Sequence, residues 1–239
     1  MKDISKTYAA VIAALEAARN GEKAQSSSRF FKTGPGQYGE GDIFWGIAVP
    51  VQRAIVRKFF HDAILDDIVQ LLDSPVHEQR LVALLILVQK FEKGDVVERE
   101  QIVDFYLTHL DRVNNWDLVD SSARYILGAW LLDHDRNILD ALAGSKNMWH
   151  QRVAITATHA FILKGDYGDT LQLATLWKKH PHDLMQKAVG WMLRETGKKD
   201  EAVLRAFLDQ YAPLLARTTL RYAIERFDEK TRRGYLTKK

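Results

Sequence analysis

Cysteine is absent from the 239-residue sequence. The chain therefore has no disulfide, no thiolate metal site and no thiol nucleophile, and any catalysis must use carboxylates, histidines, hydroxyls or a bound group. We expect neither a metal nor a redox cofactor. The absence of cysteine also fits a reducing compartment.

Long apolar runs are also missing. No stretch approaches the roughly 20 uncharged apolar residues that a membrane span needs, and the start, Met1–Ile4, lacks the apolar segment of a secretion signal. We expect a cytoplasmic protein without membrane contact. The 46% of hydrophobic residues suffices for a globular core.

Charge is distributed unevenly between the two halves. Residues 1–120 carry 14 Lys and Arg against 18 Asp and Glu, whereas residues 121–239 carry 20 against 13. This asymmetry predicts a polyanion as partner of the C-terminal half. The alternative is an ordinary solvated surface.

Helical periodicity covers most of the chain, because apolar residues recur at spacings of three and four. Short breaks containing glycine, proline or asparagine separate the periodic segments, which predicts antiparallel neighbouring helices. The predicted helices lie near residues 5–19, 51–60, 64–72, 76–91, 97–110, 116–132, 148–163, 170–178, 184–196, 201–211 and 216–226.

One segment departs from this pattern. Between Phe30 and Ile47, four glycines and a proline stand between two short aromatic runs. The segment predicts a β-hairpin or an ordered loop near residues 31–47, inserted into the helical array. Because it reads as an appendage, deletion of Gly34–Asp42 is expected to leave the remaining fold intact.

A repeated pattern indicates the fold class. Three segments share a turn, a large apolar residue, a glutamine and then a base, with a period near 36 residues. Such a period predicts one all-α domain over residues 1–239, a right-handed superhelical solenoid of HEAT-like two-helix repeats. Its repeat-equivalent bases would form a line along one face, suited to a phosphate backbone: Arg80, Arg152, Lys187 and Arg221, with Arg53 as a further candidate. The alternative is that these bases tie neighbouring repeats together through ion pairs.

At residue 116 the repeat carries tryptophan in place of a base. Trp116 and Asp120 are four residues apart and share one helix face. A carboxylate repels phosphate, so its presence on a DNA-facing surface indicates a role other than binding. Trp149 and Trp191 stand near equivalent turns. A tryptophan at helical spacing, taken alone, is more often a core residue than a site residue.

Three motifs in this order resemble the AlkD-type DNA alkylation-repair family, HEAT-like proteins that include glycosylases for cationic N3- and N7-alkylated purines. The motifs lie at residues 115–120, 149–152 and 186–195. The resemblance implies a nucleotide-facing aspartate at Asp120, two tryptophans at Trp116 and Trp191, and a backbone-holding arginine at Arg152. The other expected contacts to double-stranded DNA are Arg80, Trp149, Lys187, Arg194 and Arg221.

An alkylated purine is already a cationic leaving group, so its excision needs no general acid. An ionised Asp120 would stabilise the positive charge that develops on the sugar. Trp116 and Trp191 would pack on the nucleotide and favour its charge.

Two departures from the family leave alternatives open. Phe30 or Phe31 stands where active members have a tyrosine, and the Gly34–Asp42 insertion resembles a hairpin of sister branches that bind branched DNA without glycosylase activity. A non-catalytic binder of branched or distorted DNA is therefore the second hypothesis, and a protein-binding HEAT scaffold is the third. We expect a monomer.

Overall fold

The structure is a computed structural model that describes residues 5–238, so Met1–Ile4 lie outside the described residues. Within this range the chain is helical, and its sole β feature is an isolated parallel bridge between Ile43 and Val76. The all-α prediction is confirmed. No helix in this range is both long and apolar enough to cross a membrane.

The chain divides into two compact units, Met1–Ser122 and Ala123–Lys239, called unit 1 and unit 2 below. In each unit the helices pack mainly against their neighbours in the sequence, which is the arrangement of an α-helical solenoid. The predicted solenoid class is therefore confirmed. A single domain over residues 1–239 stays a prediction.

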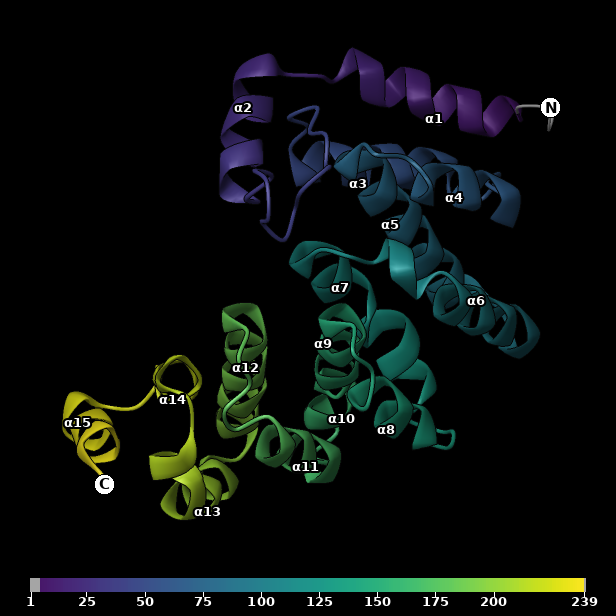
Figure 1. The fold of residues 1–239 in the computed structure, drawn as a ribbon. Helices are drawn as coiled ribbons and strands as arrows, with labels where there is room; N and C mark the ends of the chain where they lie inside the picture. The colour runs from purple at the N-terminus through teal and green to yellow at the C-terminus, as the bar shows by residue number, and fades with distance from the viewer. Residues whose placement is uncertain (1–4, 239) are drawn as a thin grey trace. The chain divides into compact units, whose positions relative to one another are not determined.

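Unit 1 is built around helix α5 (His77–Lys93), which contacts the helices before and after it in the chain. The run from Leu81 to Val88 is apolar and buried, and a helix that is apolar all round must be covered on every side. Figure 1 shows α5 between these helices. Those in contact with it are α3 (Val49–Phe59), α4 (Leu65–Leu72), α6 (Val96–Thr108) and α7 (Trp116–Ser122). Unit 1 also contains α1 (Lys6–Ala17), α2 (Gly21–Phe30) and the 3-10 turn η1 (Leu110–Arg112).

Unit 2 is built around α12 (Asp183–Lys199). A Cβ on Gly190 would lie 2.5 Å from the Cβ of Tyr222 and 2.6 Å from the carbonyl oxygen of Thr219, so glycine permits the close packing of α12 on α14. The other elements are the π-helical turn η2 (Arg124–Gly128), α8 (Asn137–Ala143), α9 (Met148–Ala157), α10 (His159–Leu163), α11 (Gly168–Leu176), α13 (Glu201–Tyr211), η3 (Ala212–Leu214), α14 (Arg217–Ala223) and α15 (Glu229–Thr237).

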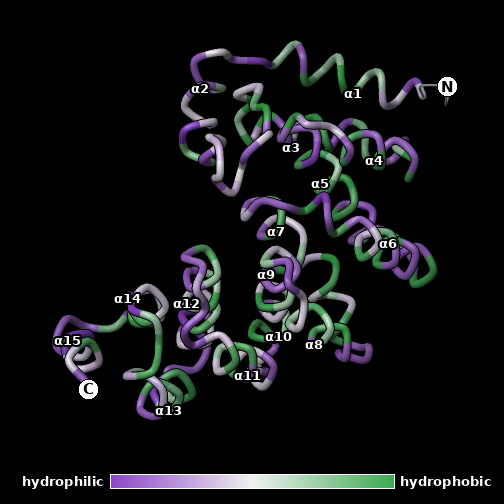
Figure 2. The backbone as a smooth tube through the Cα atoms, in the orientation of Figure 1, coloured by the Kyte–Doolittle hydropathy of each residue, from purple (hydrophilic) through white to green (hydrophobic). Residues whose placement is uncertain are grey.

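The predicted helices are found close to their expected bounds, with two kinds of difference. The segment predicted as one helix over 116–132 contains α7 and then the π-helical turn, where the Gly128 N–H bonds to the Ala123 carbonyl (2.8 Å). Three helices were not predicted: α2, α8 and α15. Figure 2 shows α2 and α15 largely in hydrophilic colours, and such segments lack the apolar stripe that sequence reasoning uses.

Residues 31–47 form an ordered loop, and no hairpin is found among the residues that the structure describes. Ile43 pairs with the turn before α5, since its N–H bonds to the Pro75 carbonyl and its carbonyl accepts the His77 N–H, both at 2.9 Å. The loop is therefore joined to the start of α5.

Candidate functional site

Trp116 and Asp120 lie on α7, one helical turn apart, and both are half-buried. The Trp116 ring stacks on Phe31, with 5.2 Å between ring centroids and 13° between ring planes, and meets the edge of Phe30 at 5.8 Å. Phe30 is 65% exposed. Trp116 therefore belongs to a partly open aromatic surface and not to the closed core of unit 1.

The carboxylate of Asp120 acts on a buried tyrosine of the neighbouring helix. Burial raises the pKa of Tyr106, the hydrogen bond with Ser122 (2.9 Å) opposes the rise, and the negative charge of Asp120 adds to it. Tyr106 thus stays a neutral phenol.

A buried ionic network lies beside Trp116, with Asp42 of the loop at its centre. Asp42 Oδ1 accepts a hydrogen bond from Arg80 Nη2 (2.7 Å), and Asp42 Oδ2 lies 3.2 Å from both His77 Nδ1 and Asn115 Nδ2. His77 Nε2 contacts Asp117 Oδ2 at 2.7 Å. The network joins the loop, α5 and the start of α7, which fixes the position of Trp116.

The two carboxylates keep His77 protonated. Burial alone would lower the pKa of His77, but hydrogen bonds to Asp117 and Asp42 outweigh this effect and raise it to about 9. Burial would likewise raise the pKa of Asp42, yet His77 and Arg80 hold it below its ordinary value. At neutral pH the network therefore contains two cations and two carboxylates.

This raised pKa predicts how stability depends on pH. A histidine with a raised folded-state pKa stabilises the fold fully below its unfolded pKa of 6.5, and the contribution disappears as pH rises through about 9. We expect the free energy of unfolding to fall by about 3 kcal/mol across that window. Denaturant titrations of the wild type and His77→Gln measure it; equal pH slopes in both proteins would contradict the assignment.

A carboxylate of α5 also holds the loop in place. Glu78 accepts the backbone N–H groups of Trp45 (3.0 Å), Gly46 (2.7 Å) and Ile47 (3.2 Å). Charge-assisted hydrogen bonds of this kind are stronger than neutral ones. Sequence reasoning missed Asp42, His77 and Glu78, because Asp42 and His77 are 35 residues apart and no local pattern connects them.

Arg80 has the structural role that was the alternative prediction. Its side chain is 7% exposed and pairs with Asp42. A phosphate could reach it only if this buried pair were broken, which is costly. We therefore remove Arg80 from the expected DNA contacts.

In unit 2, the repeated motif has a structural meaning as well. Gln151 Nε2 donates to the Ser145 carbonyl, and Gln186 Nε2, 35 residues further on, donates to the His180 carbonyl; both distances are 2.7 Å. Each glutamine thus closes the turn before its helix. The period found in the sequence corresponds to a repeated local geometry.

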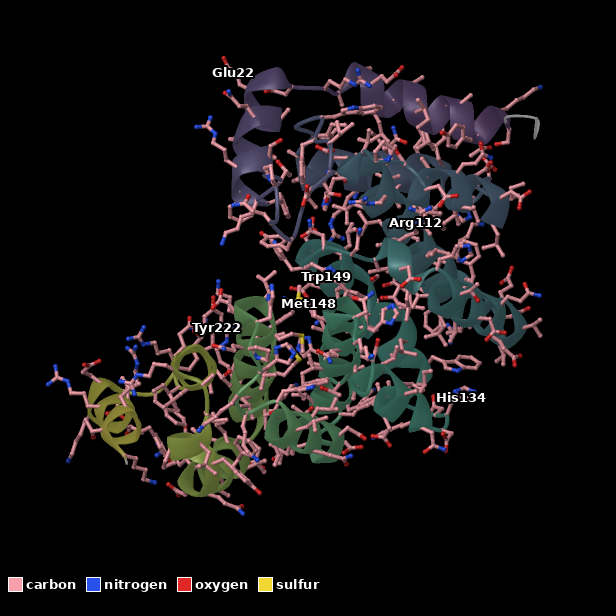
Figure 3. All side chains as sticks on the ribbon, viewed as in Figure 1. Glu22, Arg112, His134, Met148, Trp149 and Tyr222 are labelled. Carbon is pink, nitrogen blue, oxygen red and sulfur yellow. The ribbon has the colours of Figure 1, made fainter. Side chains whose placement is uncertain are left out.

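Trp149 and Arg152 lie on α9 and are 8% and 5% exposed. Trp149 lies at the N-terminal end of this helix (Figure 3). Arg152 Nη1 donates to the Leu184 carbonyl at 2.5 Å, which ties α9 to the first turn of α12. The motif therefore holds successive repeats together, and both residues are largely shielded from solvent.

Trp191 of α12 is half-buried, and its ring is oriented by polar neighbours. Its Nε1 donates to Glu195 Oε1 (3.1 Å), while Lys198 Nζ bonds to Glu195 Oε2 (2.6 Å). The edge of His159 meets the ring at 5.6 Å. Burial and the charge of Arg124 lower the pKa of His159 to about 4, so this histidine is neutral and accepts from Arg124 at Nδ1 (3.1 Å).

The remaining predicted DNA contacts are more accessible. Lys187 is half-buried and pairs with Asp183 at 2.6 Å. Arg194 pairs with Glu225 and with Glu195, and Arg221 of α14 is exposed. Unit 1 thus contains three predicted site residues, Arg80, Trp116 and Asp120, and unit 2 contains the other six.

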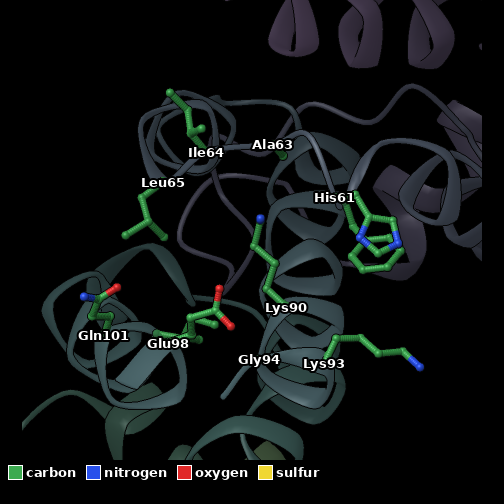
Figure 4. A pocket seen from close by; sticks show the side chains of 11 residues that line it. His61, Ala63, Ile64, Leu65, Lys90, Lys93, Gly94, Glu98 and Gln101 are labelled. Atoms are coloured by element: carbon green, nitrogen blue, oxygen red, sulfur yellow. The ribbon is translucent and has the colours of Figure 1, made fainter. Parts of the chain in front are cut away.

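A hollow of about 500 Å³ lies elsewhere in unit 1, between the turns that follow α3 and α5. Figure 4 shows Ile64, Lys90 and Glu98 among its lining side chains. Glu98 already forms the capping box of α6 with Asp95. None of the predicted site residues lines this hollow. No cluster of three or more metal-ligating side chains occurs within residues 5–238.

One family model matches most of the chain. A family model described as DNA alkylation repair enzyme matches residues 11–227. Among solved structures, a predicted DNA alkylation repair enzyme from Enterococcus faecalis is similar, with a TM-score of 0.68 and 19% sequence identity, over 88% of this chain and 97% of that one. At this identity the likeness shows the fold. No curated protein matches the sequence significantly.

Proposed function

Because the chain belongs to the DNA alkylation repair enzyme family, we propose that it is a DNA glycosylase that hydrolyses the N-glycosidic bond of cationic N3- and N7-alkylated purines. The observation that carries this proposal is the pairing of Trp116 with Asp120 on α7, where an accessible indole stands one turn from a carboxylate. A carboxylate at that place repels phosphate, so it does not itself strengthen DNA binding.

The main contribution of the protein to the reaction would be a negative charge near the deoxyribose. As the glycosidic bond breaks, its electron pair moves to the purine and neutralises the positive ring, while positive charge develops on the deoxyribose. Asp120 would stabilise that charge, and water would add to C1′ and release one proton to the solvent. No general acid is required, because the leaving group departs as a neutral base.

The two tryptophans would supply selectivity for the charged nucleotide. An indole face attracts a cation more strongly than a neutral base of the same shape. Trp116 is held by Phe31 and Trp191 by Glu195, so each ring is oriented in advance. Preorganised contacts lose less free energy when the transition state forms.

Phosphate contacts would come from Lys187, Arg194 and Arg221 in unit 2. Arg152 would act indirectly, since its guanidinium holds the start of the helix that carries Lys187. Binding should weaken with salt, as expected when cations release counterions from DNA.

The proposal is tested with duplex DNA containing a single N7-methylguanine, by measuring the released base with mass spectrometry. Release above the spontaneous rate supports the glycosylase. If no base is released from this lesion or from N3-methyladenine while a four-way junction is bound more tightly than a linear duplex, the non-catalytic binder of branched DNA replaces it.

A further inference from the structure

Helix α2 differs from the other long helices of unit 1 because it buries none of its residues. Its sequence, from Gly21 to Phe30, consists mainly of hydroxyl, amide and charged side chains. Helices that are polar all round are not stabilised by a hydrophobic face. Burial of apolar side chains in the core of unit 1 therefore does not explain why α2 is there.

Backbone contacts hold α2 in position. The Asn20 side chain caps the helix by accepting the Lys23 N–H (2.9 Å), and the Asn20 N–H bonds to the Trp45 carbonyl (2.9 Å). A Cβ on Gly46 would come within 2.1 Å of the Asn20 carbonyl oxygen, and Gly46 has φ of 75°. Glu78 holds Gly46 in place, so α2 is docked through its backbone while most of its side chains are exposed.

The side chains that α2 and the following turn present are basic. Residues 21–38 contain Lys23, Arg29 and Lys32 against the single acid Glu22, whereas the rest of residues 1–120 has 11 bases against 17 acids. These three cations are exposed, and none forms an ion pair with a described residue. Unit 1, acidic as a whole, thus has a local basic surface.

This surface includes a hollow whose lining carries several hydrogen-bond donors. The hollow has a volume of about 570 Å³, and its lining offers amide, hydroxyl and guanidinium groups. Such donors suit phosphate oxygens. Its lining residues are Gln25, Ser28, Arg29, Thr33, Gly34 and Gln37.

The basic surface leads directly to the aromatic surface around Trp116. Arg29 precedes Phe30, whose exposed ring meets the edge of Trp116. Cations beside accessible aromatic rings are typical of surfaces that bind a nucleic-acid strand, because phosphates and bases are contacted together.

We propose that α2 and its following turn, through Lys23, Arg29 and Lys32, bind the phosphodiester backbone of the DNA strand whose nucleotide lies against Trp116. The inference rests on the proposed function and assigns to unit 1 the phosphate contacts that Arg80 does not provide.

The test compares two triple variants. One, Lys23→Gln, Arg29→Gln and Lys32→Gln, removes the basic surface. The matched control, Arg57→Gln, Lys58→Gln and Lys93→Gln, removes the same charge from exposed positions elsewhere in unit 1. Affinity for a short fluorescent duplex, with and without N7-methylguanine, is measured by anisotropy over a series of salt concentrations.

We expect the first variant to lose about 0.9 of the log–log salt slope for each phosphate contact removed, close to 3 in total, and to bind at least about 10-fold more weakly at moderate salt. The control should change affinity less than about 2-fold. Neither should change the melting temperature, because all six substituted side chains are exposed.

Equal losses of DNA affinity in both variants would show an effect of net charge alone and would overturn the assignment. An unchanged salt slope in the first variant would overturn it as well. Displacement of the duplex by polyglutamate of equal charge, at equal concentration, would also overturn it, since an acidic protein would then be the better partner.

Base release by the wild type is assayed in parallel. Release of base without any effect of the α2 variant on DNA binding contradicts this inference alone. An effect of the α2 variant on binding without release of base contradicts the proposed glycosylase activity alone.

Discussion

Asp120→Asn is expected to lower the single-turnover rate of alkylpurine excision by about 100-fold or more, the size of effect seen when one preorganised electrostatic contact is removed. The substitution keeps the shape and hydrogen-bonding capacity of the side chain and removes its charge. Affinity for damaged duplex should be unchanged or slightly higher, because a negative charge facing phosphate is lost. Rates are measured with enzyme in excess over a duplex that contains one lesion.

Two neighbouring residues supply the comparisons. Trp116→Ala should also slow excision, but part of its effect should be weaker binding of damaged DNA, since sugar packing is lost. Asp117→Asn, three residues from Asp120, disturbs the contact with His77 and should lower the melting temperature, while the folded fraction loses much less activity than Asp120→Asn does. If Asp120→Asn behaves like Asp117→Asn, losing stability and not specific activity, Asp120 is a structural residue.

Asp42→Ala is expected to reduce the free energy of unfolding by about 3 to 5 kcal/mol, because it leaves Arg80 and protonated His77 buried without their shared carboxylate. Urea titration monitored by circular dichroism measures the change. Glu40→Ala is the matched control: this carboxylate is exposed and accepts the Gly36 N–H, so its loss should cost less than about 1 kcal/mol.

This prediction reverses the expectation for the Gly34–Asp42 deletion. The segment looks like an appendage in the sequence, yet its last residue is the centre of the buried network beside α7. The deletion should therefore destabilise unit 1. An Asp42→Ala protein with wild-type stability would contradict the role of the network.

The fold could be predicted largely because solenoid helices bury one face against neighbours that are close in sequence. The apolar stripes of segments such as 64–72 and 201–211 follow from that one-sided burial. Helix α2 has no apolar stripe, because backbone contacts with Asn20 and Gly46 hold it in place. The sequence also could not decide between a hairpin and an ordered loop for residues 31–47, because the loop is held by Glu78 and His77, which lie in a different part of the sequence.

The site was predicted unevenly for a related reason. The spacing of Trp116 and Asp120 on one helix is local, so the sequence was sufficient to place them on one face. Whether each arginine is paired or exposed depends on residues that are distant in the sequence. Arg80 meets Asp42 and Arg152 meets the Leu184 carbonyl, and no local pattern distinguishes such a paired base from an exposed one like Arg221.

The release of free base from methylated duplex DNA tests the central claim most directly. Wild-type protein, incubated with DNA that contains both N3-methyladenine and N7-methylguanine, should release at least one of these bases well above the rate of spontaneous depurination, and Asp120→Asn at the same concentration should approach that background. Wild-type protein that binds this DNA in a salt-dependent manner and releases neither base above background would contradict the account.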